Sequence, residues 1–80
     1  MTIEALDARG LLCPLPVAHA RRLLRTLPDG ALFEVLGDDP LFLLDMQAFC
    51  AQEGHTYLGD RDEPGGGWRV SLRKVSASRP

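Results

Sequence analysis

The sequence predicts an α/β fold, a two-layer sandwich in which a four-stranded mixed sheet carries two helices on one face, in the order βαβαββ. Runs of apolar residues with helical spacing alternate with shorter runs of strand-forming residues. Gly, Pro and Asp residues typical of turns separate these runs. The chain has 80 residues, which suffices for one small domain but not for two. We expect the domain to occupy residues 1–75 and residues 76–80 to form a frayed tail.

The first strand is predicted from Thr2 to Asp7, where successive side chains divide between two faces. A turn follows, in which Gly10 can adopt a backbone angle that other residues avoid. The run from Val17 to Leu27 has the apolar spacing of an amphipathic helix, and Pro28-Asp29-Gly30 ends it. The expected buried stripe of this helix consists of Val17, Ala20, Leu24 and Leu27, with Leu23 beside it.

A second strand is expected from Ala31 to Leu36, followed by a second helix over Leu41 to Glu53. Asp39 is predicted to be the N-cap of that helix, with Pro40 at its first helical position. Asp45 falls beside the apolar face of the helix, where it could meet a basic partner. The expected core face consists of Phe42, Met46, Phe49 and Cys50.

The last part of the chain is predicted to form a β-hairpin. Gly54 ends the second helix, and a third strand runs from His55 to Asp62. A glycine-rich loop over residues 63–67 leads to a fourth strand from Trp68 to Val75. We expect the first two strands to pair in parallel through a right-handed crossover and the last two to pair antiparallel.

A domain this small has no deep substrate cavity, which argues against a conventional enzyme.

Composition and charge exclude several classes of protein. The apolar fraction is 45% and the formal net charge is −2, so neither disorder nor a broad nucleic-acid surface is expected. The sequence has no apolar run long enough to span a membrane, and its N-terminus does not resemble a signal peptide. Its two cysteines lack a CxxC spacing and do not make a disulfide framework. We expect a cytoplasmic protein, because a free thiol at Cys13 persists in a reducing compartment.

The stretch from Arg9 to Pro16 places Cys13 between a strand and a helix. Free amides at the helix start, such as those of Leu15 and Val17, and the macrodipole favour the thiolate, so we expect a lowered pKa for Cys13. The two prolines should hold Cys13 and Leu15 in extended or turn conformations, with the helix beginning within Pro14 to Pro16. On these local grounds a reactive Cys13 and a buried structural Cys13 are equally supported.

Four blocks of the sequence resemble the TusA/SirA family of sulfur carriers in their order and spacing. Leu6 to Pro16 is similar to the family signature, which contains a Cys-Pro-x-Pro motif. Asp38-Asp39-Pro40 stands where the family usually has Thr-Asp-Pro, and Asp45 to Cys50 resembles its Asp-Ile-Pro-x-Phe/Trp-Cys. Gly54-His55 resembles its Gly-His. The resemblance spans Leu6 to Lys74 and implies the same two-layer sandwich with a four-stranded mixed sheet.

The resemblance implies that Cys13 accepts sulfane sulfur as a persulfide from a donor protein and passes it to an acceptor protein, as a sulfurtransferase-type carrier. It implies no cofactor beyond this covalent persulfide, and no metal. The donor would be a cysteine desulfurase or a rhodanese, and the family serves tRNA thiolation, molybdenum-cofactor assembly, sulfur oxidation and selenium metabolism. Leu15 departs from the Glu that many members have there, which should favour the thiolate further. The supporting residues so implied are Arg9, Gly10, Pro14, Leu15, Pro16, Asp39 and Asp45.

Two other functions stay open at the level of sequence. The fold class also resembles the C-terminal domain of bacterial translation initiation factor three, which suggests an RNA- or protein-binding module with a basic face on the first helix. That face would consist of Arg21, Arg22 and Arg25. A thiol redox sensor would oxidise Cys13, although Cys50 is expected to be buried and inert. The sequence lacks a convincing basic and aromatic RNA surface, so we expect no direct contact with nucleic acid, and none with a membrane.

Overall fold

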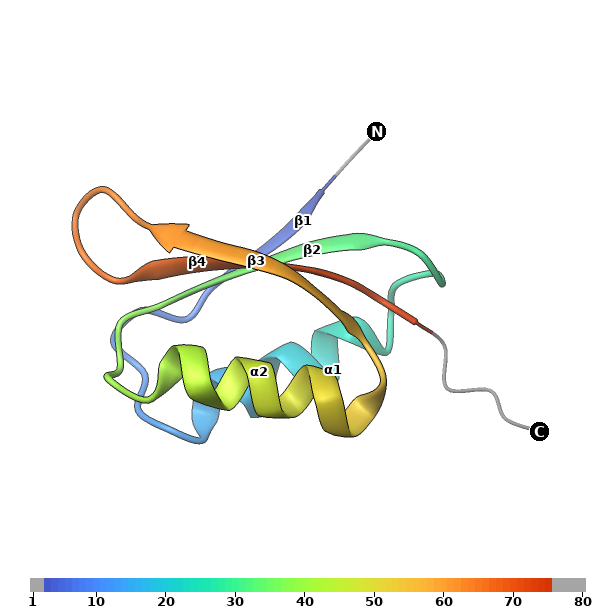
Figure 1. Ribbon diagram of the computed structural model, residues 1–80, viewed down its shortest axis with the longest axis horizontal. Coiled ribbons are helices and arrows are strands. Elements are labelled where there is room, and N and C mark those ends of the chain that lie inside the picture. The colour runs from blue at the N-terminus through green and yellow to red at the C-terminus, as the bar shows by residue number, and fades with distance from the viewer. Residues whose placement is uncertain (1–2, 76–80) are drawn as a thin grey trace.

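The structure, a computed structural model, describes residues 3–75 and contains the predicted order of elements (Figure 1). The predicted tail at residues 76–80 lies outside the described residues. The elements are β1 (Glu4–Asp7), α1 (Leu15–Leu24), β2 (Leu32–Gly37), α2 (Phe42–Glu53), β3 (Thr56–Asp62) and β4 (Trp68–Arg73). The βαβαββ prediction is therefore confirmed.

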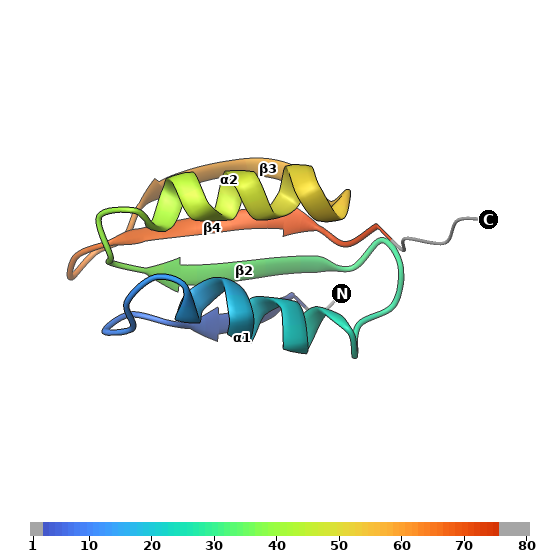
Figure 2. The ribbon, with the colours of Figure 1, turned by 90° about the horizontal axis from the view of Figure 1, so that it is seen from below.

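The four strands form one sheet in the order β1-β2-β4-β3. β1 and β2 pair in parallel, whereas β4 pairs antiparallel with both β2 and β3. Both helices lie on the same face of the sheet, with α1 against β1 and β2 and α2 against β4 and β3 (Figures 1 and 2). The predicted two-layer arrangement with a mixed sheet is thus confirmed. The position of β4 between β2 and β3 is a feature that the sequence patterns do not specify.

The core lies between the sheet and the helices. Phe33 and Val35 of β2 and Val70 and Leu72 of β4 are fully buried. Alternation along each strand turns these side chains toward the helices and their neighbours toward the open face of the sheet. Burying a side chain of this size stabilises a fold by about 1.5–3 kcal/mol relative to leaving it exposed. The helices contribute Ala20, Leu24, Phe42, Met46, Phe49 and Cys50, all of them predicted core residues.

The open face of the sheet carries a polar network centred on Arg69. Its Nη1 donates to Glu34 at 2.7 Å, and its Nε donates to Glu63 at 2.9 Å. Ser71 donates to the second oxygen of Glu34 at 3.2 Å. These carboxylates raise the pKa of Arg69 above its ordinary value through hydrogen bonds and charge. The network therefore pairs polar side chains on the sheet face that no helix covers.

The start of α1 falls within Pro14 to Pro16, as predicted, but the conformation of Leu15 and the end of the helix differ from the prediction. Leu15 was expected to be non-helical because Pro16 follows it, but it is the first residue of α1. Both prolines near the helix start fit its first turn, where the amide that proline lacks has no partner within the helix. Regular helix ends at Leu24, and the next turn continues with tighter bonds, such as Thr26 N–H to the Leu23 carbonyl at 3.0 Å. Leu27 therefore still packs against the core.

The start of α2 also differs from the prediction. The helix begins at Phe42 with Leu41 as its N-cap, so the assignments of Asp39 as N-cap and Pro40 as first helical residue are wrong. The Asp39 carboxylate instead accepts the Leu41 N–H at 2.8 Å within the preceding turn. The predicted end at Gly54 is confirmed, because Gly54 has a φ of +84° and donates its N–H to the Cys50 carbonyl.

Across residues 3–75, no helix is long and apolar enough to cross a membrane.

Candidate functional site

Cys13 lies in the loop between β1 and α1, and its side chain is exposed. Gly10 gives this loop a φ of +87°, a left-handed angle that other residues rarely adopt and that the sequence analysis anticipated. The Cys13–Pro14 peptide bond is cis. Leu15 donates its N–H to the Leu12 carbonyl at 2.8 Å, so the expectation that this amide is free for a bound sulfur is wrong. The loop thus presents the thiol at the start of α1 without using that amide.

Two consecutive aspartates after β2 hold the Cys13 loop. Asp38 Oδ1 accepts the Gly10 N–H at 2.9 Å, and Asp39 Oδ2 accepts the Cys13 N–H at 3.3 Å. The other Asp39 oxygen accepts the Leu41 N–H at 2.8 Å. One carboxylate therefore joins the backbone of Cys13 to the turn that leads into α2. Asp39 thus lies in the turn before α2, whose N-cap is Leu41.

The Cys13 side chain opens into a groove of about 180 Å³ between α1 and α2. We call this the thiol groove. Arg21 lines it. The Arg21 Nε donates to Glu53 at 3.3 Å, and the guanidinium lies 5.4 Å from the centre of the Phe49 ring. The groove is shallow and part apolar, which suits contact with another surface more than enclosure of a substrate. Its lining residues are Cys13, Pro14, Val17, Arg21, Asp45, Ala48, Phe49 and Gln52.

The electrostatic surroundings of Cys13 oppose the thiolate. Hydrogen bonding to the Asp45 side chain is the largest cause that raises the pKa of Cys13, followed by loss of solvent and by the charges of Asp45 and Asp39. The predicted lowering of this pKa by the helix start is therefore wrong. Two nearby carboxylates outweigh a macrodipole whose effect is about 0.3–1 kcal/mol at an exposed position. Asp45 was expected to meet a basic partner, and it faces the thiol instead.

Replacing Asp45 by asparagine is expected to lower the pKa of Cys13, because an amide carries no charge and accepts a thiol proton less strongly than a carboxylate. The measurement is the rate of Cys13 alkylation by iodoacetamide against pH in a Cys50→Ala background. Its inflection should move to lower pH in Asp45→Asn. Asp60→Asn, which removes a carboxylate of β3 outside the thiol groove, should leave the inflection in place. An unmoved inflection in Asp45→Asn would show that loss of solvent, not Asp45, sets this pKa.

Some of the other predicted site residues line the thiol groove and some do not. Arg9 forms a two-pronged ion pair with Asp7, at 2.9 and 2.7 Å, which holds the pKa of Asp7 at about 2. Arg9 does not line the thiol groove. Pro14 lines the groove, whereas Pro16 is buried and does not line it. The Leu15 side chain is 46% exposed, so it adds apolar surface beside Cys13.

Cys50 is buried, as expected, and burial raises its pKa to about 11. Both cysteines are free thiols. A thiol that is buried and neutral is a poor nucleophile, so Cys50 does not compete with Cys13. Among residues 3–75, no group of three or more His, Cys, Asp or Glu side chains is placed to hold a metal ion.

The thiol groove and the fold can now be compared with known proteins. The sequence model of the family described as sulfurtransferase TusA matches residues 4–74 of this chain. The chain belongs to the TusA family. The match spans every element from β1 to β4 and includes the Cys13 loop, Asp39 and Asp45. The resemblance read from the sequence is therefore confirmed at the level of the family.

Individual TusA-family proteins agree with this assignment. The sulfur carrier protein TusA of Pseudomonas syringae pv. syringae is 39% identical over 66 residues, which cover 81% of this chain and 79% of that protein. The sulfur carrier protein TusA of Allochromatium vinosum is 34% identical over 71 residues, covering 89% and 92%. The crystal structure of a SirA-like protein from Desulfitobacterium hafniense superposes with a TM-score of 0.79 at 25% identity, covering 94% of this chain and all of that one.

Within this TusA-family fold, two residues were not assigned to the Cys13 site from the sequence. Asp38 holds the Gly10 amide across a separation of 28 residues. Arg21, predicted only as part of a basic face, lines the thiol groove and pairs with Glu53 across 32 residues. The spacing of apolar residues shows only which residues share a face of one helix or strand. It cannot show that residues distant in the sequence are neighbours in the fold. The only sequence signal for Asp38 is its place beside Asp39 in the block that resembles the family.

Proposed function

We propose that this protein is a sulfur carrier that accepts sulfane sulfur on Cys13 as a persulfide and passes it to an acceptor protein. The observation that carries the proposal is the exposed Cys13 thiol at the edge of a shallow groove, in a chain that belongs to the TusA family. A groove of about 180 Å³ leaves the sulfur open to a second protein and does not enclose a substrate. The sulfur would therefore move between protein thiols.

The proposed loading step is an exchange at sulfur. The Cys13 thiolate attacks the outer sulfur of a donor persulfide, forming a new S–S bond while the S–S bond of the donor breaks. The donor leaves as a thiolate and takes up the proton that Cys13 loses. Delivery repeats the exchange with an acceptor thiol, so no external oxidant or reductant is consumed. The donor class would be a cysteine desulfurase or a rhodanese, and a reducing compartment such as the cytoplasm would keep Cys13 available.

Asp45 would accept the proton in this exchange. It interacts with the thiol in the resting protein, where it raises the pKa of Cys13. Attack requires the thiolate, and a carboxylate in contact with the thiol can take the proton as the new S–S bond forms. After loading, the same negative charge would repel an anionic persulfide. Asp45 would thus favour transfer of the sulfur to an acceptor over its retention.

Intact-protein mass spectrometry tests the proposal. The full chain is incubated with a cysteine desulfurase and cysteine, with a rhodanese and thiosulfate, and with inorganic polysulfide. We expect a gain of one sulfur with at least one donor, removed by dithiothreitol and located in the peptide that contains Cys13. No gain with any of the three donors, or a gain located only at Cys50, would overturn the proposal.

A further inference from the structure

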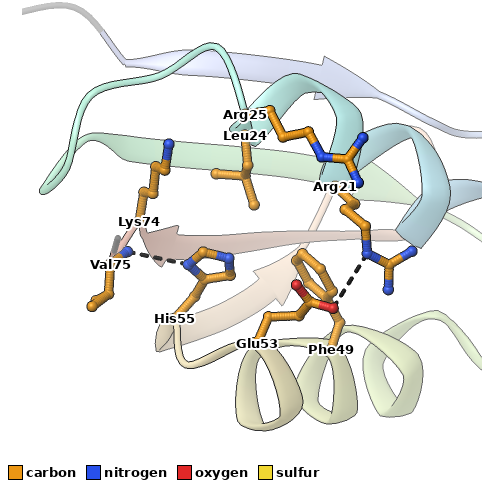
Figure 3. Close-up of a pocket in the computed structure, with 8 residues that line it drawn as sticks. All are labelled: Arg21, Leu24, Arg25, Phe49, Glu53, His55, Lys74 and Val75. Carbon is orange, nitrogen blue, oxygen red and sulfur yellow. Dashed lines mark hydrogen bonds and ion pairs between the residues drawn. The ribbon is translucent and has the colours of Figure 1, made fainter. Parts of the chain in front are cut away.

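A second cavity lies at the other end of α1 and α2 from Cys13. Its volume is about 160 Å³, and it shares Arg21 and Phe49 with the thiol groove. We call it the basic pocket. Figure 3 shows the side chains that line it. They come from α1, from α2 and from the segments beside β3 and β4, and they surround the pocket. The polar groups in this lining are Arg21, Arg25, Glu53, His55 and Lys74.

The charges in the basic pocket do not balance. Glu53 is its single carboxylate, and it pairs with Arg21. The Lys74 ammonium group donates a hydrogen bond to the Leu27 carbonyl. That carbonyl is polar but carries no negative charge to balance the ammonium. The Arg25 guanidinium makes no hydrogen bond or ion pair within residues 3–75. Two positive side chains therefore face the pocket without a negative partner there.

His55 adds a directed donor to this pocket. Its Nδ1 accepts the Val75 N–H at 3.1 Å, so the neutral ring carries its hydrogen on Nε2. Figure 3 shows that second nitrogen on the side of the ring away from Val75, toward the pocket. The ring is held in place by Phe49, 5.4 Å away between ring centres. Burial of the ring lowers the pKa of His55. The charge of Glu53 raises this pKa, and the charge of Lys74 lowers it.

We propose that the basic pocket binds a small oxyanion, a phosphate or a carboxylate, between Arg25, Lys74 and the Nε2–H of His55. Charge-assisted hydrogen bonds from guanidinium and imidazole suit such oxygens. The volume holds a group of a few heavy atoms but not a nucleotide. An anion there would neutralise the excess positive charge that the fold leaves unpaired. This site is independent of the sulfur chemistry proposed for Cys13.

The proposal predicts a link between anion binding and pH. A bound anion favours imidazolium, so it should raise the pKa of His55 and offset part of the effect of burial and Lys74. By reciprocity, binding should tighten as pH falls through the His55 pKa. The groups that face His55 in the pocket are Arg21 and Arg25 of α1, Glu53 of α2 and Lys74 after β4. His55 is the one imidazole among these groups. Acetate, unlike phosphate, does not titrate near neutral pH, so the pH dependence of acetate binding would report His55.

NMR titration of the histidine ring protons tests the site with the full chain. Sodium phosphate and sodium acetate are titrated separately at constant ionic strength, with chloride as the balancing salt. We expect a saturable shift and a raised pKa for His55 only, whereas the resonances of His19 outside the pocket should show no saturable change. The tighter of the two ligands identifies the source as a phosphate or a carboxylate group.

A matched pair of variants completes the test. Arg25→Gln removes the unpaired cation and should weaken binding about tenfold, the usual order of one charge-assisted hydrogen bond. Arg22→Gln makes the same change in the same helix but outside the pocket, and it should bind as the wild type does. No saturable shift of His55 with either anion, or equal binding by Arg25→Gln and wild type, would overturn the proposal.

Discussion

Cys13→Ser is expected to reduce sulfur loading to background with every donor. A serine hydroxyl is close in size to the thiol but does not attack sulfane sulfur, and no second exposed thiol can replace it. The measurement is the intact mass after incubation with a desulfurase and cysteine, supported by radioactive sulfur transferred from labelled cysteine. Circular dichroism should show an unchanged fold, because Cys13 is exposed and its N–H bond to Asp39 comes from the backbone.

Cys50→Ala is the matched control for that experiment. It removes the other cysteine and should load sulfur to the same extent as the wild type, because the Cys50 thiol is buried with a pKa of about 11. It should also lower the free energy of unfolding by about 1 kcal/mol, since it leaves a small cavity in the core. Full loading of Cys13→Ser, or loss of loading in Cys50→Ala with the fold intact, would contradict the assignment of Cys13.

Gly67→Ala is expected to destabilise the fold strongly for so small a change. Gly67 ends the β3–β4 loop with a φ of +85°, and a Cβ there would lie 2.5 Å from the Gly37 carbonyl oxygen. The left-handed angle costs about 1–2 kcal/mol for a residue with a Cβ, and overlap with the backbone adds about 1–3 kcal/mol. Unfolding in urea should show a total loss of about 2–5 kcal/mol, a large share of the stability of a small domain.

Gly66→Ala separates these two causes. Gly66 has a φ of +111° in the same loop, but a Cβ there meets no atom within 4 Å. It should therefore lose about 1–2 kcal/mol from the backbone angle alone. The difference between the two variants measures the contact with Gly37. Equal losses would show that β2 and the loop move apart and absorb the overlap.

Gly67→Ala should also disturb the site. The added Cβ would approach the Asp38 Cβ to 3.0 Å, and the Asp38 carboxylate holds the Gly10 amide of the Cys13 loop. Any shift of Gly37 and Asp38 that relieves the overlap therefore loosens the segment that carries the thiol. Under conditions where both variants are folded, we expect slower sulfur loading in Gly67→Ala than in Gly66→Ala.

Much of the fold follows from local patterns in the sequence. The stripe through Ala20 and Leu24 and the stripe through Phe42, Met46 and Phe49 identify both helices and their buried faces. Alternation identifies β2 and β4 because one face of each strand is buried. These patterns predict the elements correctly because the buried face of a helix or a strand requires apolar residues at the period of that element. The boundary at Phe42 was less predictable, since the Asp39 carboxylate before it also binds the Cys13 N–H, 26 residues away in the sequence.

The sequence by itself determined the elements, the core residues and the family. Only the tertiary structure decided that β4 lies between β2 and β3, and that Asp38, Asp39 and Asp45 gather around the Cys13 loop. Those contacts join residues 26 or more positions apart, and they reverse the sign of the expected Cys13 pKa shift. The physical reason is that electrostatic effects depend on distance in space, which local sequence patterns do not encode.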